Sequence, residues 1–178
     1  MKNRIWTIAD THFGHKNMVE YCGRPTDFSE RIEKNLLTTL KAGDVLIHLG
    51  DICIGRDQYW HDRVIRRIPA KKWLCIGNHD RKSNTWYLNN GWDMVCRAVS
   101  FKAFQTKVLF SHKPQALPLE KDEIDLNIHG HFHNSNHRDQ EPHLTKRLRK
   151  NHYCFILEHQ GYTAVKLENI INEVRKKL

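Results

Sequence analysis

Short apolar runs, each followed at once by polar residues, constrain the fold of this chain more than any other feature. Five such runs are present: Ile5–Ala9, Val45–Leu49, Trp73–Ile76, Val108–Phe110 and Leu126–Ile128. Most are rich in Ile, Val, Leu or aromatic residues, which is typical of buried strands. The runs therefore predict strands whose ends carry polar side chains.

Segments with helical spacing lie between and after the predicted strands. The clearest starts at Asp27, continues with apolar residues at helical spacing to Leu40 and ends at Gly43. Another starts at Asp57 and ends before Pro69, and two more cover Thr85–Asn90 and Glu168–Lys177. The pattern predicts an α/β protein with two sheets stacked between helices, without fixing the number of layers.

The second half of the chain carries two hairpin patterns. Val99–Phe104 alternates apolar and polar residues and is predicted to pair antiparallel with Val108–Ser111. Tyr153–Leu157 and Tyr162–Lys166 flank Gln160-Gly161 and predict a late hairpin. The back half is therefore expected to be more antiparallel than the front.

Length and composition favour an ordinary cytoplasmic domain. The 178 residues are predicted to form a single domain over 1–178. Hydrophobic residues make up 39% and, with glycine, approach the ~45–50% of globular proteins, which excludes general disorder. The start lacks the apolar core of a signal peptide, and no run approaches the ~18 residues of a membrane span. The 5 cysteines contain no CxxC pair, so neither a disulfide framework nor a thiolate zinc site is indicated.

Each of the five predicted strands ends in Asp, Asn or His. In layered α/β proteins the carboxyl ends of strands line the ligand crevice, so these residues are expected to meet. The candidate metal ligands are Asp10, His12, Asp51, Asn78, His112, His131 and His133. Singly, the Asp-x-His pair is more often a turn or surface pair and His112 more often a core or rim histidine, whereas the motif at 130–133 is evenly balanced between a metal site and a structural role. The joint order of the motifs after apolar runs therefore carries the prediction. Seven ligands exceed the four of a lone zinc site, whereas two ions sharing one carboxylate would use them all.

This ligand set favours two borderline ions. Mixed carboxylate, amide and imidazole groups suit manganese first, with iron, zinc or nickel as alternatives, and argue against calcium. Two such ions generate a hydroxide nucleophile and stabilise phosphoryl oxygens. His79 lies beside the ligand Asn78 but has no place in the ligand count. It is placed to give a proton to a leaving group.

The order D-x-H, G-D, G-N-H-[DE], H and G-H-x-H, which spans positions 10 to 133, resembles the calcineurin-like metallophosphoesterase family. The short chain further resembles its small bacterial and phage branch of predicted phosphoesterases. The resemblance implies a four-layer αββα sandwich of two mixed sheets flanked by helices. It also implies that a metal-bridging hydroxide attacks phosphorus, with His79 as the proton donor. The implied ligand sets are Asp10, His12 and His133 for one metal and Asn78, His112 and His131 for the other, with Asp51 as the bridge.

One departure from the family's best-known branch concerns the residues after Asp51. Protein Ser/Thr phosphatases carry G-D-x-x-D-R, whereas Ile54 occupies the second Asp position here, which disfavours a protein phosphatase. The residue that orients His79 is left open between Asp80 and Asp57. The candidate substrate contacts are Arg56, one residue beyond the family Arg, together with His15 and Arg24, for which solvated surface is the commoner role.

Charge leaves the substrate open. The net charge of +9 favours polyanionic partners. A basic cluster follows the last ligands, and as a loop beside the metal centre it could hold a nucleotide or nucleic acid; it comprises Lys146, Arg147, Arg149 and Lys150. We therefore expect a dinuclear phosphoesterase for a phosphate mono- or diester, either a small ester, a nucleotide or a nucleic-acid end. The alternative is a non-catalytic metal-binding interaction module or a nucleic-acid-binding module on the same fold. His79 argues against it, and no protein partner is predicted.

Overall fold

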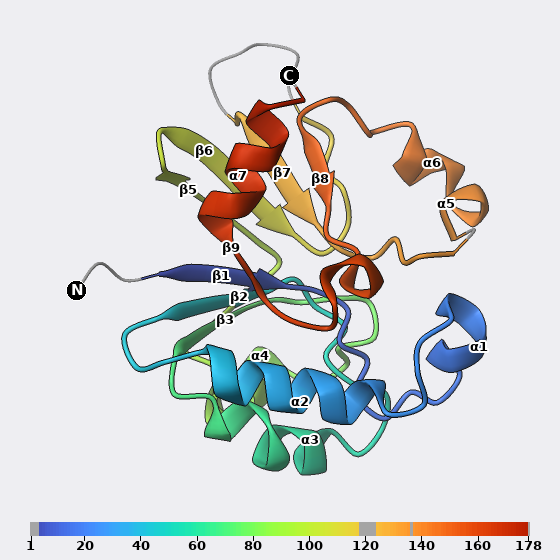
Figure 1. The fold of residues 1–178 in the computed structure, drawn as a ribbon, viewed down its shortest axis with the longest axis vertical. Helices are drawn as coiled ribbons and strands as arrows, with labels where there is room; N and C mark the ends of the chain where they lie inside the picture. Colours follow the sequence, from blue (N-terminus) through green and yellow to red (C-terminus); the bar gives the residue numbers. More distant parts are fainter. Residues whose placement is uncertain (1–3, 118–123, 136, 178) are drawn as a thin grey trace.

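A computed structural model describes residues 4–117, 124–135 and 137–177, and its strands form two sheets (Figure 1). The first sheet has the order β4-β3-β2-β1-β9. Its strands are β1 (Ile5–Ile8), β2 (Val45–His48), β3 (Lys71–Cys75), β4 (Met94–Cys96) and β9 (Val165–Lys166). The first four run parallel, and β9 pairs antiparallel with β1.

The second sheet has the order β5-β6-β7-β8. Its strands are β5 (Ala98–Ala103), β6 (Thr106–Ser111), β7 (Leu126–His129) and β8 (His152–Cys154). β5 and β6 form an antiparallel hairpin, whereas β6, β7 and β8 run parallel. Both sheets are therefore mixed, which confirms the predicted fold class, although the back half is less antiparallel than expected.

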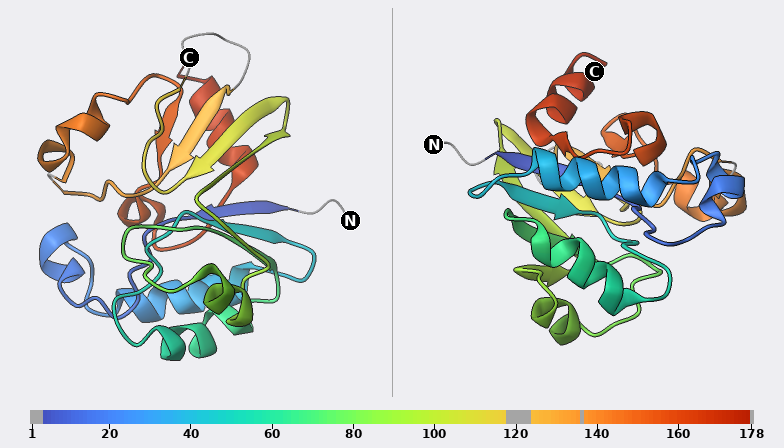
Figure 2. Two further views of the ribbon diagram at one scale, coloured as in Figure 1. Left: turned by 180° about the vertical axis from the view of Figure 1, so that it is seen from behind. Right: turned by 60° about the horizontal axis from the view of Figure 1, so that its bottom comes forward.

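Helices flank the two sheets (Figures 1 and 2). Those beneath the first sheet are α2 (Phe28–Thr39), α3 (Asp57–Arg63) with the 3₁₀ turn Ile65–Arg67, and α4 (Asn84–Asn89). α7 (Leu167–Arg175) follows β9 directly and lies against the second sheet. The short helices near the strand ends are α1 (Met18–Cys22), α5 (His137–Gln140), α6 (Pro142–Thr145) and the 3₁₀ turn Leu157–Gln160.

The helices confirm most of the helical predictions. α2 buries Ile32, Leu36 and Leu40 at helical spacing, so its apolar side packs into the core. The third predicted helix begins at Asn84 rather than Thr85. Ser83 caps it, because the Ser83 hydroxyl accepts a hydrogen bond from the Trp86 N–H. Residues 134–152, predicted as a loop, instead contain α5 and α6. None of the helices in the described segments has the length and apolar character needed to cross a membrane.

The predicted late hairpin is wrong. β8 pairs parallel with β7 in the second sheet, whereas β9 pairs with β1 in the first, so the two strands do not pair with each other. Leu157 and Ala164 between them are buried in the core. The chain therefore crosses from one sheet to the other, and β9 covers the edge of β1 that a local hairpin would have left unpaired.

Candidate metal centre

The structure brings all seven predicted ligands together where the strands of both sheets end. The loops after β1, β2 and β3 supply the ligands from the first sheet, and those after β6 and β7 supply the rest. Three groups of described side chains have ligand atoms within 4.8 Å of one another, and two of them consist of predicted ligands: Asp10, His12 and His133 in the first cluster, and Asp51, His112 and His131 in the second. The third group, Cys22, His133 and Glu158, shares only His133 with the predicted set. The first cluster contains the residues predicted for one metal, and the second contains two of the residues predicted for the other together with the predicted bridge, Asp51.

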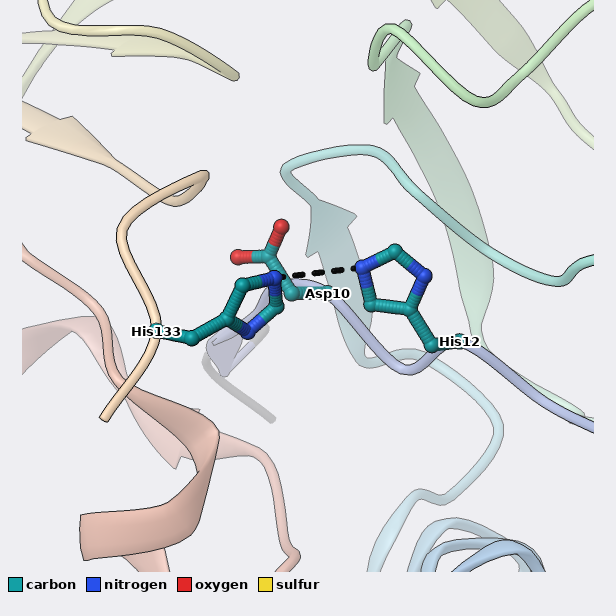
Figure 3. A group of neighbouring side chains, drawn as sticks. All are labelled: Asp10, His12 and His133. Carbon is teal, nitrogen blue, oxygen red and sulfur yellow. Dashed lines mark hydrogen bonds between the residues drawn. The ribbon is translucent and has the colours of Figure 1, made fainter. Parts of the chain in front are cut away.

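The first cluster joins the loop after β1 to the loop after β7. Figure 3 shows its three side chains pointing toward one another, and the Nε2 atoms of His12 and His133 lie 3.2 Å apart. Asp10 Oδ2 accepts a hydrogen bond from the His131 N–H at 3.0 Å, whereas its Oδ1 is buried and has no hydrogen-bond partner within the described residues. A buried carboxylate oxygen without a donor is a ligand atom available to a cation.

The second cluster presents lone pairs to a common centre. His112 Nδ1 lies 2.8 Å from the Leu49 carbonyl and must donate to it, so its Nε2 carries a lone pair. That Nε2 lies 2.8 Å from Asn78 Oδ1 and 3.2 Å from His131 Nδ1. His131 in turn directs its Nε2 at the Glu141 carboxylate, which assigns the proton to Nε2 and leaves Nδ1 as an acceptor. Acceptors facing acceptors repel one another unless a cation lies between them.

Asp51 lies between the two clusters. Its Oδ2 is 3.6 Å from His12 Nε2 and 3.5 Å from His112 Nε2, so a single oxygen faces both. Its Oδ1 accepts the His79 backbone N–H at 2.8 Å, which fixes the carboxylate plane. This geometry fits a bridging carboxylate.

Burial makes the site electrostatically unfavourable without a cation. Burial, followed by the nearby Asp51 charge, raises the pKa of Asp10 well above its ordinary value. Burial likewise lowers the pKa of His112 to about 3, so the imidazole is neutral. Neutral imidazoles and crowded carboxylates together are the donor set of a divalent metal site.

The backbone at the ligands is strained. Asp10, His12, Asp51 and His131 all have φ between 45° and 70°, a region that non-glycine residues rarely adopt. Such conformations cost roughly 1–3 kcal/mol each and cluster at functional sites. The neighbouring Gly130 leaves no room for a Cβ, which would collide with the Asp10 carboxylate. The loops are therefore shaped for the ligands at a cost in stability.

Comparison with known proteins agrees with this geometry. Residues 3–161 match the family model described as calcineurin-like phosphoesterase. The chain belongs to the calcineurin-like phosphoesterase family. It is 25% identical to an uncharacterized protein of Methanocaldococcus jannaschii, over 97% of this chain and 92% of that protein. It also resembles a protein of unknown function from Aquifex aeolicus, with a TM-score of 0.73 and 24% identity over 96% of this chain and 99% of that chain. That structure supports the fold alone.

His79 is a partly exposed side chain beside this calcineurin-like centre. It keeps 38% of its side-chain surface, and its Nε2 lies 4.0 Å from Asp51 Oδ2. Neither predicted orienting residue has a hydrogen bond to the ring within the described part of the chain. The Asp80 carboxylate instead accepts hydrogen bonds from the backbone N–H groups of Asp51, Ile52 and Gly77, at 2.8–3.0 Å. Asp80 therefore ties the loops after β2 and β3 together, which corrects its predicted role, and Asp57 begins α3.

A buried ion pair, which the sequence patterns did not predict, supports the first cluster. Glu158 Oε1 lies 3.6 Å from His133 Nδ1 and 2.7 Å from Arg24 Nη2. Burial acts to raise the pKa of Glu158, but the facing His133 ring and the charge of Arg24 together lower it to about 2. Arg24 also donates to the carbonyls of Asp10 and Thr11. Its side chain has 0% exposed surface, so both predictions for Arg24, substrate contact and solvated surface, are corrected.

A second carboxylate, also missed by the sequence, supports the other cluster. Glu141, immediately before α6, contacts His131 Nε2 through one oxygen and Lys113 Nζ at 3.0 Å through the other. Burial acts to raise the pKa of Glu141, and the hydrogen bonds from His131 and Lys113 lower it to about 2. A carboxylate behind a ligand imidazole fixes the ring and its tautomer.

The remaining predicted contacts lie at different distances from the centre. A cavity of about 410 Å³ opens onto both clusters, and His15 lines it together with His79. Arg56, which immediately precedes α3, is exposed, with its guanidinium 4.3 Å from the Tyr59 ring centroid, and does not line this cavity. Of the basic cluster, Arg149 and Lys150 line a separate cavity of about 460 Å³. The predicted nucleic-acid role of that cluster stays a prediction.

Proposed function

We propose that this protein is a dinuclear metal-dependent phosphoesterase that hydrolyses phosphate mono- or diesters. The observation that carries the proposal is the pair of acceptor-lined clusters sharing Asp51 Oδ2, with His79 exposed beside them. Membership of the calcineurin-like phosphoesterase family supports the reaction class.

The residues present fit two divalent ions. Asp10, His12 and His133 would hold one ion and Asn78, His112 and His131 the other, with Asp51 between them. When bound, such ions supply a nucleophile from water at neutral pH and stabilise charge on phosphoryl oxygens. Manganese suits the mixed donor set, and iron, zinc or nickel would also be held.

The chain's own contribution to the reaction is centred on His79. Its backbone N–H is fixed by Asp51, and its ring lies 5.4 Å from the His12 ring, so it faces the same space as the ligands. Its exposure leaves the imidazole free to give a proton to a departing ester oxygen. A structural metal site would need the ligands but no such group.

The substrate is a phosphate ester small enough to place its phosphorus between the clusters. The small cavity suits a small ester, a nucleotide or a nucleic-acid end. The exposed ligand faces and the positive charge of bound ions would attract the phosphate.

The proposal is tested by metal-dependent turnover. Purified protein with Mn²⁺ should hydrolyse an activated aryl phosphate mono- or diester, and a chelator should abolish the activity. His79→Ala should retain two metal ions per chain but lose most of the rate, whereas the exposed His143→Ala should change neither. Metal binding without turnover by Mn²⁺, Fe²⁺, Zn²⁺ or Ni²⁺ would instead support the non-catalytic alternative.

A further inference from the structure

The cavity at the metal centre has two different walls. One wall carries the predicted ligands and His79, and the other is formed by α1, through Met18, Tyr21 and Cys22. Among the described residues that line it there is no Lys or Arg. The ester group of a substrate whose phosphate lies at the ligands would therefore meet an uncharged, partly aromatic surface.

Aromatic rings lead from the ligands to the rim of this cavity. The centroid of the His15 ring lies 5.6 Å from that of His12, and the Tyr21 ring follows 6.2 Å beyond His15 at an angle of 81°. Asn17 Nδ2 donates to Tyr21 Oη at 3.3 Å, which restrains the ring. Tyr21 lines the cavity and is 58% exposed, so its ring is accessible to a ligand bound there.

We propose that the exposed Tyr21 ring, with the His15 ring at a right angle beside it, forms a stacking platform that makes this site selective for nucleoside monophosphate esters. The inference rests on the proposed function, because it places the phosphate at the metal ligands. Every nucleobase has a π-face that stacks on an aromatic side chain without requiring charge. With the phosphate at the ligands, the sugar would lie near His15 and the base would reach Tyr21, which lies beyond His15.

The same wall disfavours more highly charged substrates. Recognition of a second phosphate or of a nucleic-acid backbone relies on Lys and Arg side chains. Arg149 and Lys150 line the separate cavity, and Arg56 is stacked on Tyr59. Arg81 and Lys82 line a neighbouring cavity on the far side of His15 and His79, away from the α1 wall. The platform therefore favours a single phosphate attached to a planar group.

The test compares two phosphates that differ only in the base. Adenosine 5′-monophosphate and ribose 5-phosphate share the phosphate and the sugar. With Mn²⁺, wild-type protein should show a kcat/KM at least about fivefold higher for the nucleotide, the lower end of the effect of stacking one base on an aromatic side chain. Tyr21→Ala should remove this preference with little change for ribose 5-phosphate, and Tyr21→Phe should restore it.

The design separates this inference from the proposed function. Leu88, exposed on α4 and outside the cavity, provides the control variant Leu88→Ala, which should keep the preference. Both phosphates are also titrated by calorimetry into Mn²⁺-loaded His79→Ala protein, so that the comparison does not require turnover. Equal affinity for both, or a preference unchanged in Tyr21→Ala, overturns the platform even if an aryl phosphate is hydrolysed. Absence of aryl phosphate hydrolysis by the metal-loaded wild-type protein would count against the proposed function.

Discussion

The two halves of the metal centre use the same arrangement in different surroundings. In each half an imidazole turns one nitrogen to the ligand cluster and the other to a carboxylate, which pairs with a cation. His133, Glu158 and Arg24 make up the buried relay, whereas His131, Glu141 and Lys113 make up the exposed relay. The ion pairs are similarly short, 2.7 Å and 3.0 Å, but the side chains of the first are 0% and 4% exposed and those of the second 34% and 20%.

The two relays have similar geometry but should contribute differently to the free energy of unfolding. Both carboxylates orient a ligand ring, but the charges of the buried relay have been removed from water and depend on each other. Arg24 is also bonded to the backbone of the loop that carries Asp10, so it supports the fold and the site together. In the exposed relay, Glu141 lies just before α6 and Lys113 follows β6. This ion pair remains hydrated, so it should affect the site with little effect on the fold.

The largest expected effect is on stability. Arg24→Met should lower the free energy of unfolding by about 3–5 kcal/mol, because it leaves Glu158 as an unpaired buried charge. Lys113→Met is the matched control and should cost less than about 1 kcal/mol. Urea unfolding of the metal-free proteins measures both. Equal losses in the two variants would contradict the distinction between the relays.

The next effect is on metal affinity in the exposed relay. Glu141→Ala should lower the affinity for one of the two metal ions about 10–100-fold, because His131 loses the group that fixes its ring and tautomer. The other ion should bind as before, since its imidazoles do not contact Glu141. Calorimetric titration with Mn²⁺ resolves the two sites. Glu168→Ala, an exposed change on α7, serves as the control.

If Glu141→Ala lowers the affinity for both metal ions equally, the two metal sites act as one unit. Unchanged affinity for both would show that the Leu49 carbonyl, which holds the His112 ring, and the Asp10 carboxylate, which holds the His131 N–H, already fix the second cluster without Glu141. Either result would change the comparison of the relays, and the stability of the variant should be measured beside it to exclude unfolding.

The candidate ligands could be predicted from the sequence because each one lies shortly after the end of a strand. Strand ends of parallel sheets gather at one edge, so local patterns such as Asp10-Thr11-His12 were enough to predict a common site. Glu141 and Glu158 carry no such signal: they follow their histidines by 10 and 25 positions in segments without a strand pattern. Their contacts depend on how α6 and the turn at 157–160 pack.

The errors have the same physical origin. Arginine is mostly exposed in proteins, so the burial of Arg24 follows only from its tertiary partners. The late hairpin failed because pairing of β9 with β1, more than 150 positions away, buries more than a local turn would. Helix spacing, in contrast, is local, and α2 followed its pattern closely.

The smallest expected effect is the dependence of the exposed relay on salt. The Lys113–Glu141 pair is hydrated, so its contribution should be below about 1 kcal/mol and should fade at 1 M salt, where the screening length is about 3 Å. Lys113→Met should therefore lower Mn²⁺ affinity at the second site slightly at low salt and not measurably at high salt. The Arg24–Glu158 pair is shielded from ions in solution, so the stability lost in Arg24→Met should persist at both salt concentrations. If the loss in Arg24→Met also fades with salt, the buried relay is open to solvent and the two halves of the centre are alike.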